Sequence, residues 1–296
     1  MTTYKITHTT SYAYSGVSSV CHNLLMMTPR EGGRVETHNH RIVIRPTPTV
    51  SSRRKDYFGN HVNSFSVEEQ HKKLVITATS RVTVSGETLD GSAGPAWERV
   101  RDDVQNATDP EWFEASAYVF DSPRIARSGV FAQYAAQSFR PAAHMIEALR
   151  DFTARIHSDF VYDAGATAVD TPVDKSFQLR RGVCQDFAHV GVACIRSIGL
   201  PARYVSGYLR TVPPPGKERL VGADQSHAWI AVYCGADLGW VEIDPTNKPF
   251  CSSAQVPVTW GRDYSDVVPL RGVFVGGGEH VLTVSVDVCP AESKSS

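Results

Sequence analysis

The chain has 296 residues, of which 42% are hydrophobic and 21% charged, and its formal net charge is −1 at pH 7. Because acidic and basic side chains nearly balance, we expect neither nucleic acid nor a membrane surface as a partner. No apolar run reaches the about 20 residues of a membrane-spanning helix, and the first residues lack the apolar core of a secretory signal. The six cysteines include no C-x-x-C pair, which argues against a disulfide framework or a zinc site and favours a cytoplasmic location.

The beginning of the chain predicts an antiparallel β domain, which we assign to residues 1–90. Apolar and polar residues alternate from Tyr4 to Tyr14, and Ser15-Gly16 ends the pattern. Further strands, rich in Val, Ile and Thr, are predicted at His38–Arg45, Val62–Val67 and Leu74–Ser85. Such strands are typical of a small sandwich. The histidines of this region follow no metal-ligand spacing, so we expect no metal site among them: His38, His40, His61 and His71.

A change in composition separates this domain from the rest of the chain. Glu87 to Pro95 is rich in Gly, Ser, Asp and Pro, which is typical of a linker. Helical segments are predicted at Trp97–Val104, Pro110–Phe120, Gly129–Ser138 and Pro141–His157, and residues 158–175 are expected to form a loop. We therefore assign residues 91–140 to a linker with short helices. Residues 141–296 are expected to form a core with a C-terminal β extension, in which Val281–Val288 alternates again.

The most informative segment is a predicted helix that begins at Cys184 and ends at Gly199, before Pro201. The unpaired amides and the positive dipole end at a helix start stabilise a thiolate, so Cys184 is a candidate nucleophile. Cys194 lies about 280° further around the same helix and is expected in the core. A nucleophilic thiol needs a base, which the rest of the chain must supply.

Two strands after this helix contain a candidate base and a residue to orient it. Ser226–Cys234 and Trp240–Asp244 both alternate and are separated by a glycine-rich turn, so they predict a hairpin. A two-residue loop places His227 directly opposite Asp244, with Cβ atoms about 5 Å apart, whereas a four-residue loop makes them diagonal neighbours at about 7–8 Å. Either loop brings imidazole and carboxylate within reach, as nucleophilic catalysis by a thiol requires.

Three segments resemble the bacterial transglutaminase-like family: Gly182-Val-Cys-Gln-Asp-Phe-Ala-His189, Ser226-His-Ala-Trp229 and Gly239-Trp-Val-Glu-Ile-Asp-Pro-Thr-Asn247. The first ninety residues and Trp260–Asp266 also look like bacterial members, so the resemblance covers nearly the whole chain. It implies an α+β fold in which an N-terminal antiparallel β-sandwich precedes a transglutaminase-like, papain-like core. It also implies that the catalytic triad is Cys184, His227 and Asp244.

The resemblance implies a thiol-dependent enzyme without metal or cofactor. Cys184 would attack a carboxamide of a protein or peptide, and His227 would protonate the leaving ammonia or amine. Water or a primary amine would then resolve the thioester, and we expect hydrolysis or mixed activity rather than strict cross-linking. The family includes transglutaminases, peptidases, amidases and inactive relatives, so a binding module that has lost catalysis is the alternative.

The remaining site residues are less well determined by the sequence. The backbone amide of Cys184 is the expected first oxyanion donor. The second is either Gln178, where papain-like proteases have a side-chain donor, or Tyr162, which would replace the aromatic donor of transglutaminases. Aromatic residues near the hairpin are expected either to line a shielded substrate cleft or to pack in the core: Trp229, Trp240, Trp260 and Tyr264.

Overall fold

The computed structural model describes residues 1–86, 89, 94–106, 110–211, 224–247 and 250–291, so most of the predicted linker stretch Glu87–Pro95 lies outside the described residues. The helices are α1 (Trp97–Gln105), α2 (Pro110–Ser116), α3 (Gly129–Ala136), α4 (Met145–Asp159), α5 (Val173–Leu179), α6 (Cys184–Ser197) and the 3₁₀ turn η1 (Tyr264–Asp266). The strands are β1 (Thr2–Leu25), β2 (Val35–Arg45), β3 (Val50–Lys55), β4 (His61–Val67), β5 (His71–Val84), β6 (Val161–Tyr162), β7 (Arg181–Gly182), β8 (Ala202–Leu209), β9 (Gln225–Tyr233), β10 (Trp240–Ile243), β11 (Gln255–Gly261), β12 (Leu270–Gly276) and β13 (His280–Pro290). The structure has the predicted α+β composition.

The N-terminal strands form an antiparallel sheet around the long strand β1. The register of β1 shifts between Ala13 and Ser18, and its two halves have different neighbours. The first half lies between β5 and β13, and the second half lies between β4 and β12. Hydrogen bonding thus joins the predicted sandwich strands into one seven-stranded sheet. Its two halves share an apolar cluster that includes Ile76 of β5 and Phe65 of β4.

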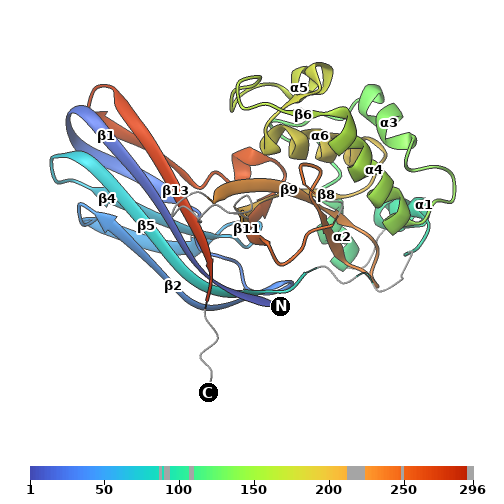
Figure 1. Ribbon diagram of the computed structural model, residues 1–296, viewed down its shortest axis with the longest axis horizontal. Helices are drawn as coiled ribbons and strands as arrows, with labels where there is room; N and C mark the ends of the chain where they lie inside the picture. Colours follow the sequence, from blue (N-terminus) through green and yellow to red (C-terminus); the bar gives the residue numbers. More distant parts are fainter. Residues whose placement is uncertain (87–88, 90–93, 107–109, 212–223, 248–249, 292–296) are drawn as a thin grey trace, which may run out of the picture.

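The C-terminal strands belong to this first sheet. β13 pairs with β1 from Tyr4↔Pro290 to Tyr14↔His280, and Figure 1 shows the red-orange β13 beside the blue β1. The alternating Val286 and Val288 are buried in a cluster with residues of β1, β2, β5, β8 and β11. The β extension therefore returns to the domain at the beginning of the chain, whereas the sequence places it with the core of residues 141–296.

The second unit consists of a four-stranded sheet and the helices. The strand order is β10-β9-β8-β11, and α6 packs on β8 and β9 while α3, α4 and α5 contact α6. Helix α6 is buried from Asp186 to Arg196, which explains why its sequence is apolar on nearly all sides. Its residues lie in the largest apolar cluster of the described residues, together with Phe152 of α4 and Ile230 of β9.

Apolar and polar contacts join the two sheets. Tyr208 of β8 and Val256 of β11 belong to the same cluster as Tyr4 of β1. Beside this cluster, Arg34 forms a 2.6 Å ion pair with Glu242 of β10. These contacts fix β1 and β13 against the sheet that contains His227.

The sequence patterns do not predict seven of the described elements: β3, β6, α5, β7, β11, η1 and β12. The seven residues of α5 lie within and just beyond the expected loop, and they bury only Val173, Ser176 and Phe177. β3 is exposed along its whole length, and β11 is buried along most of its length, so neither strand alternates. The predicted end of the first strand at Ser15-Gly16 is also wrong, because the register shift bends β1 without ending it. No helix of the described residues is both long and apolar enough to cross a bilayer.

Candidate active site

Cys184 is the first residue of α6, and a buried carboxylate fixes this helix start. Asp186 accepts hydrogen bonds from the Val183 amide at 2.8 Å and from the hydroxyls of Thr167 and Ser176 at 2.7 Å each. Gly182 has a positive φ of 156°, and a Cβ atom at this position would overlap the Asp186 carboxylate. Glycine before the nucleophile therefore leaves room for the group that caps the helix. Sequence reasoning missed this role of Asp186.

The hairpin has the four-residue loop, one of the two alternatives consistent with the sequence. Trp240 pairs with Tyr233, which makes His227 and Asp244 diagonal neighbours. The His227 Nε2 atom lies 2.9 Å from Asp244 Oδ2. Asp244 is fully buried. Its carboxylate accepts further hydrogen bonds from the Thr246 amide at 3.0 Å, Asn247 Nδ2 at 3.0 Å and Gln255 Nε2 at 3.1 Å.

The electrostatics of this pair favour its charged form. Burial alone raises the pKa of Asp244, but the hydrogen bond and charge of His227 outweigh it, so the pKa of Asp244 is lowered. Burial alone lowers the pKa of His227, but hydrogen bonds to Asp244 and to the Cys184 side chain outweigh it, so the pKa of His227 is raised. Because Nε2 contacts Asp244, Nδ1 is the ring nitrogen left to contact the thiol. The geometry brings Cys184, His227 and Asp244 into one chain of contacts.

A cleft of about 390 Å³ opens beside Cys184 and His227. The second sheet contributes Tyr204 and Ser206, and the first domain contributes residues of β1 and β13 that sequence reasoning did not connect with the site: His8, Thr10, Tyr12, Leu282 and Val284. His8 Nδ1 lies 2.9 Å from the Tyr208 hydroxyl, and burial lowers the pKa of His8 to about 4. His8 is therefore a neutral polar group near neutral pH.

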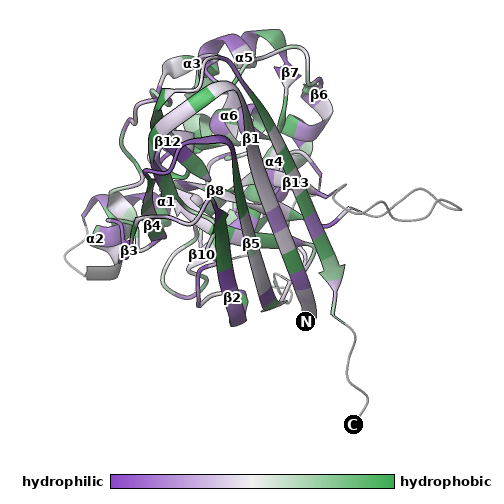
Figure 2. Ribbon diagram, turned by 90° about the vertical axis from the view of Figure 1, so that its left-hand side faces the viewer, coloured by the Kyte–Doolittle hydropathy of each residue, from purple (hydrophilic) through white to green (hydrophobic). Residues whose placement is uncertain are grey.

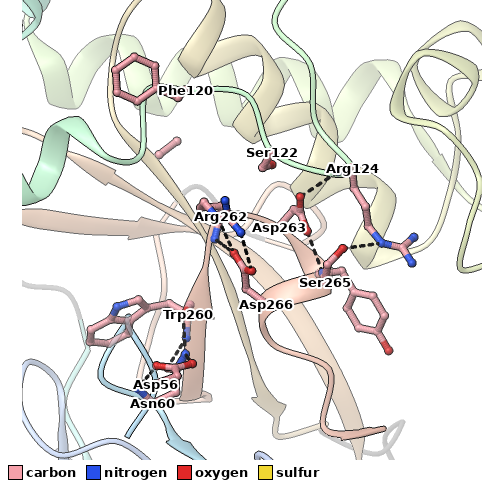
Figure 3. A network of polar contacts seen from close by, with 12 residues as sticks. Asp56, Asn60, Phe120, Ser122, Arg124, Trp260, Arg262, Asp263, Ser265 and Asp266 are labelled. Carbon is pink, nitrogen blue, oxygen red and sulfur yellow. Dashed lines mark hydrogen bonds and ion pairs between the residues drawn. The ribbon is translucent and has the colours of Figure 1, made fainter. Parts of the chain in front are cut away.

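Tyr264 is the predicted cleft residue that does line the cleft. It lies in η1, where Asp263 accepts hydrogen bonds from the amides of Ser265 at 2.8 Å and Arg124 at 2.9 Å (Figure 3). The amide of Tyr264 donates to His189 Nε2 at 3.2 Å, and burial lowers the pKa of His189 to about 4. His189 thus supports the wall of the cleft as a neutral acceptor.

The three predicted tryptophans do not line the cleft. Trp229 is fully buried and donates from Nε1 to Glu242 at 2.8 Å. Trp240 packs under the Arg203 guanidinium, 3.6 Å from its ring centroid. Trp260 stacks with Arg30 at 3.5 Å, and its backbone bonds to the Asn60 side chain from the first domain (Figure 3). Only the first residues of β9 reach the cleft, and the three rings pack outside it.

The two oxyanion candidates differ in their relation to Cys184. Gln178 lies on α5 with its side chain exposed, and it does not line the cleft. Tyr162 lies on β6, which pairs with β7 just before the nucleophile. Burial raises the pKa of Tyr162, and the charge of Cys184 raises it further, so the phenol lies within electrostatic reach of the thiol. Neither side chain lines the cleft, and electrostatic proximity to the thiol is what distinguishes Tyr162 from Gln178. No cluster of metal-ligating side chains is found among the described residues.

Comparison with known proteins identifies two family regions in the chain. Residues 4–83 match the bacterial transglutaminase-like N-terminal region, and residues 132–245 match the transglutaminase-like superfamily. The second match contains Cys184, His227 and Asp244.

Similar proteins and a similar structure extend over most of the chain. An uncharacterised protein of Mycobacterium tuberculosis is 40% identical over 98% of this chain and 93% of its own length. One from Mycobacterium leprae is 33% identical over 96% of this chain and 97% of its own. A solved structure of a Cytophaga hutchinsonii protein, proposed to be a cysteine protease, covers 100% of this chain and 92% of that one. Its TM-score is 0.74 at 19% identity, which shows a shared fold. The chain belongs to the transglutaminase-like superfamily and carries the bacterial transglutaminase-like N-terminal region.

Proposed function

We propose that the protein is a thiol-dependent amide hydrolase or acyltransferase whose catalytic triad is Cys184, His227 and Asp244. The observation that carries this proposal is the chain of contacts from a thiol at a helix start, through His227, to a fully buried Asp244 at 2.9 Å. A nucleophile, a base and an orienting group in this order are the requirements for covalent catalysis by cysteine. The superfamily and its cysteine-protease-like fold support the same chemistry.

The reaction begins with the Cys184 thiolate beside the His227 imidazolium. The sulfur attacks the carbonyl carbon of a carboxamide, and the Cys184 amide at the helix start stabilises the oxyanion, with Tyr162 as the second donor. The tetrahedral intermediate collapses to a thioester when His227 gives its proton to the departing ammonia or amine. His227 then removes a proton from water or from a primary amine, which attacks the thioester and frees Cys184.

The cleft indicates an uncharged substrate group. Its lining contains no Asp, Glu, Lys or Arg among the described residues. Neutral polar groups lie beside aliphatic and aromatic side chains, including Ser206, Tyr204 and Leu282. A carboxamide of a peptide or a glutaminyl side chain matches this lining, because neither places an unpaired charge in the cleft. We therefore propose a protein or peptide amide as the acyl donor.

The positions of the tryptophans favour hydrolysis over strict cross-linking. An enzyme that transfers the acyl group to an amine must exclude water, which is present at roughly 55 M, from the thioester. Of the aromatic side chains that could shield it, the large rings of Trp229 and Trp240 are packed away from the cleft, and the tyrosines Tyr12, Tyr204 and Tyr264 remain in its lining. We propose hydrolysis with a primary amine as a competing acceptor. A thiolate nucleophile must also stay reduced, so we place the protein in the cytoplasm.

The test compares wild-type protein with Cys184→Ala on a small glutamine donor, benzyloxycarbonyl-glutaminyl-glycine, with and without millimolar methylamine. We expect ammonia release by the wild type and none by Cys184→Ala, with mostly carboxylate product. Cys289→Ala is the matched control, because Cys289 lies in β13 away from the cleft, and it should keep wild-type activity. Equal ammonia release by wild type and Cys184→Ala would show that Cys184 is not the nucleophile. Mostly methylamide product would show a transferase.

A further inference from the structure

Strand β13 forms an edge of the first sheet beside the catalytic cleft. It pairs with β1 along its length, and Figure 2 shows it beyond β1 at the rim of the sheet. Leu282 and Val284 line the cleft that also contains Cys184 and His227. The edge of β13 that faces away from β1 therefore borders the space in which a substrate must lie.

The hydrogen bonds show which backbone groups of β13 point away from β1. The Ala291 amide donates to the Thr3 carbonyl, and the Ser15 amide donates to the Glu279 carbonyl, so the odd-numbered residues of β13 bond to β1. In an antiparallel ladder, the residues between them direct their N–H and C=O groups to the opposite side. The Val288 amide follows this rule, because it donates to Asp224 Oδ2 at 2.6 Å.

Within the described residues, the outward side of β13 is covered at one end and unpaired at the other. Asp224 covers it through the bond to Val288 and an isolated bridge to Val286. Beyond that bridge, no strand of the described residues pairs with the outward groups of Leu282 and Val284. These residues are 50% and 49% exposed. The unpaired part of the edge thus coincides with the part that lines the cleft.

The composition of this edge is typical of a surface that pairs with another strand. Natural edge strands are usually protected from pairing by charged residues, proline or bulges. From Val281 to Val286 the sequence Val-Leu-Thr-Val-Ser-Val contains neither charge nor proline, and its pairing with β1 has no bulge. The cleft lining likewise contains no Asp, Glu, Lys or Arg among the described residues. Backbone groups flanked by aliphatic side chains bind an extended peptide, whose main chain supplies the hydrogen bonds.

We propose that an extended segment of the substrate pairs with the outward edge of β13 at Leu282 and Val284 and so presents its carboxamide to Cys184. This inference rests on the proposed function and deepens it, because it names the substrate class as a peptide strand and not a small amide. It also gives the N-terminal sheet a role in substrate binding. The aliphatic side chains of β13 then contact alternate side chains of the bound peptide.

The first test uses an acetylated peptide in which threonine and valine alternate on both sides of a central glutamine. We expect its kcat/KM to exceed that of N-acetylglutamine amide. Only every second amide of a paired strand faces its neighbour, in a parallel or an antiparallel pair. N-methylation of one alternating set of amides should therefore lower kcat/KM roughly three- to tenfold per lost hydrogen bond, whereas methylation of the other set should not. Equal effects of both sets would overturn the proposal.

The second test changes the edge itself. Leu282→Pro removes an outward N–H but no bond to β1, so it should lower kcat/KM for the peptide by a larger factor than kcat/KM for N-acetylglutamine amide. Leu282→Lys provides a second variant if the proline variant does not fold. Its matched control is Val281→Lys, because Val281 is 67% exposed but does not line the cleft. Wild-type peptide turnover in folded Leu282→Pro or Leu282→Lys would contradict strand pairing.

Binding can be measured without turnover, which separates this proposal from the proposed function. The same peptide, added to ¹⁵N-labelled Cys184→Ala protein, should shift the amide resonances of Leu282 and Val284. Shifts without wild-type turnover would contradict the proposed catalysis and retain the binding site. Turnover of the peptide by the wild type without these resonance shifts would contradict the binding site and retain the proposed catalysis. A dimer that disappears in Leu282→Lys would show that a second copy of the chain covers the edge, and would overturn the proposal.

Discussion

Replacement of Asp244 by asparagine tests both the hairpin register and the role of the buried carboxylate. Three donors converge on Oδ2, from His227, Asn247 and Gln255, and the Thr246 amide donates to Oδ1. An asparagine side chain has one oxygen, so either orientation leaves at least one buried donor facing an NH₂ group. We expect its oxygen to replace Oδ2, which keeps three bonds and leaves the Thr246 amide without an acceptor.

The magnitudes follow from burial and charge. One unsatisfied buried donor costs about 1–3 kcal/mol of unfolding free energy. Loss of the negative charge beside the buried His227 removes about 3–5 kcal/mol of stabilisation of the imidazolium, if it behaves like other buried ion pairs that lose one partner. At about 1.4 kcal/mol per factor of ten, the expected fall in kcat/KM is about 10²–10⁴-fold.

The effect on stability should also depend on pH. The raised pKa of His227 stabilises the fold fully below its unfolded value of about 6.5, and this contribution is lost as pH rises through the folded pKa. The lowered pKa of Asp244 stabilises the fold above its unfolded value of about 3.9, and this contribution is lost as pH falls through the folded pKa. Urea denaturation should therefore show the largest difference between wild type and Asp244→Asn between about pH 4 and about pH 6.5.

Glu242→Gln provides the matched control for Asp244→Asn. Glu242 is a buried carboxylate on the same hairpin, but it contacts Trp229 and Arg34 and not His227. We expect Glu242→Gln to lower stability and to retain most of the activity. If Asp244→Asn keeps wild-type kcat/KM while Glu242→Gln loses it, Asp244 does not orient His227.

Two further predictions concern His227 and the oxyanion site. In His227→Ala, iodoacetamide should alkylate Cys184 more slowly than in wild type, because the side chain that contacts the thiol and can take its proton is missing. Equal rates in the two proteins would contradict this contact. Tyr162→Phe should lower kcat about 10²–10³-fold with little change in stability, because the phenol is 52% exposed, whereas Gln178→Ala should stay near wild type. A reversal of these two results would assign the second oxyanion donor to Gln178.

The contacts that the sequence predicted are those set by local rules. The start of α6 at Cys184 follows from its residue pattern, and hairpin alternation leaves only two loops that put His227 and Asp244 on one face. The donors that fix Asp244 could be identified only in part. Asn247 lies within the segment that resembles the family, whereas Gln255 enters from β11, a mostly buried strand without alternation.

The tryptophans show why residue type alone does not identify a cleft. Trp229 shares a face of β9 with His227, and alternation alone would place both rings in the site. Cys251 and Arg34 approach this face from distant parts of the chain and cover it from Trp229 onward. Which end of a strand remains open depends on such long-range contacts, and no pattern within the strand encodes them.

The same argument explains why the first domain was not predicted as part of the site. Its contribution depends on the pairing of β1 with β13. This pairing joins residues from opposite ends of the chain, such as Ile6 and Val288. This pairing places Thr10 and Val284 side by side in the lining of the cleft that also contains His227. Separating the β domain from the core would remove that part of the lining and leave Cys184, His227 and Asp244 in place. The contacts of the proposed triad therefore belong to the core, whereas the shape and chemistry of the proposed substrate cleft depend on both sheets.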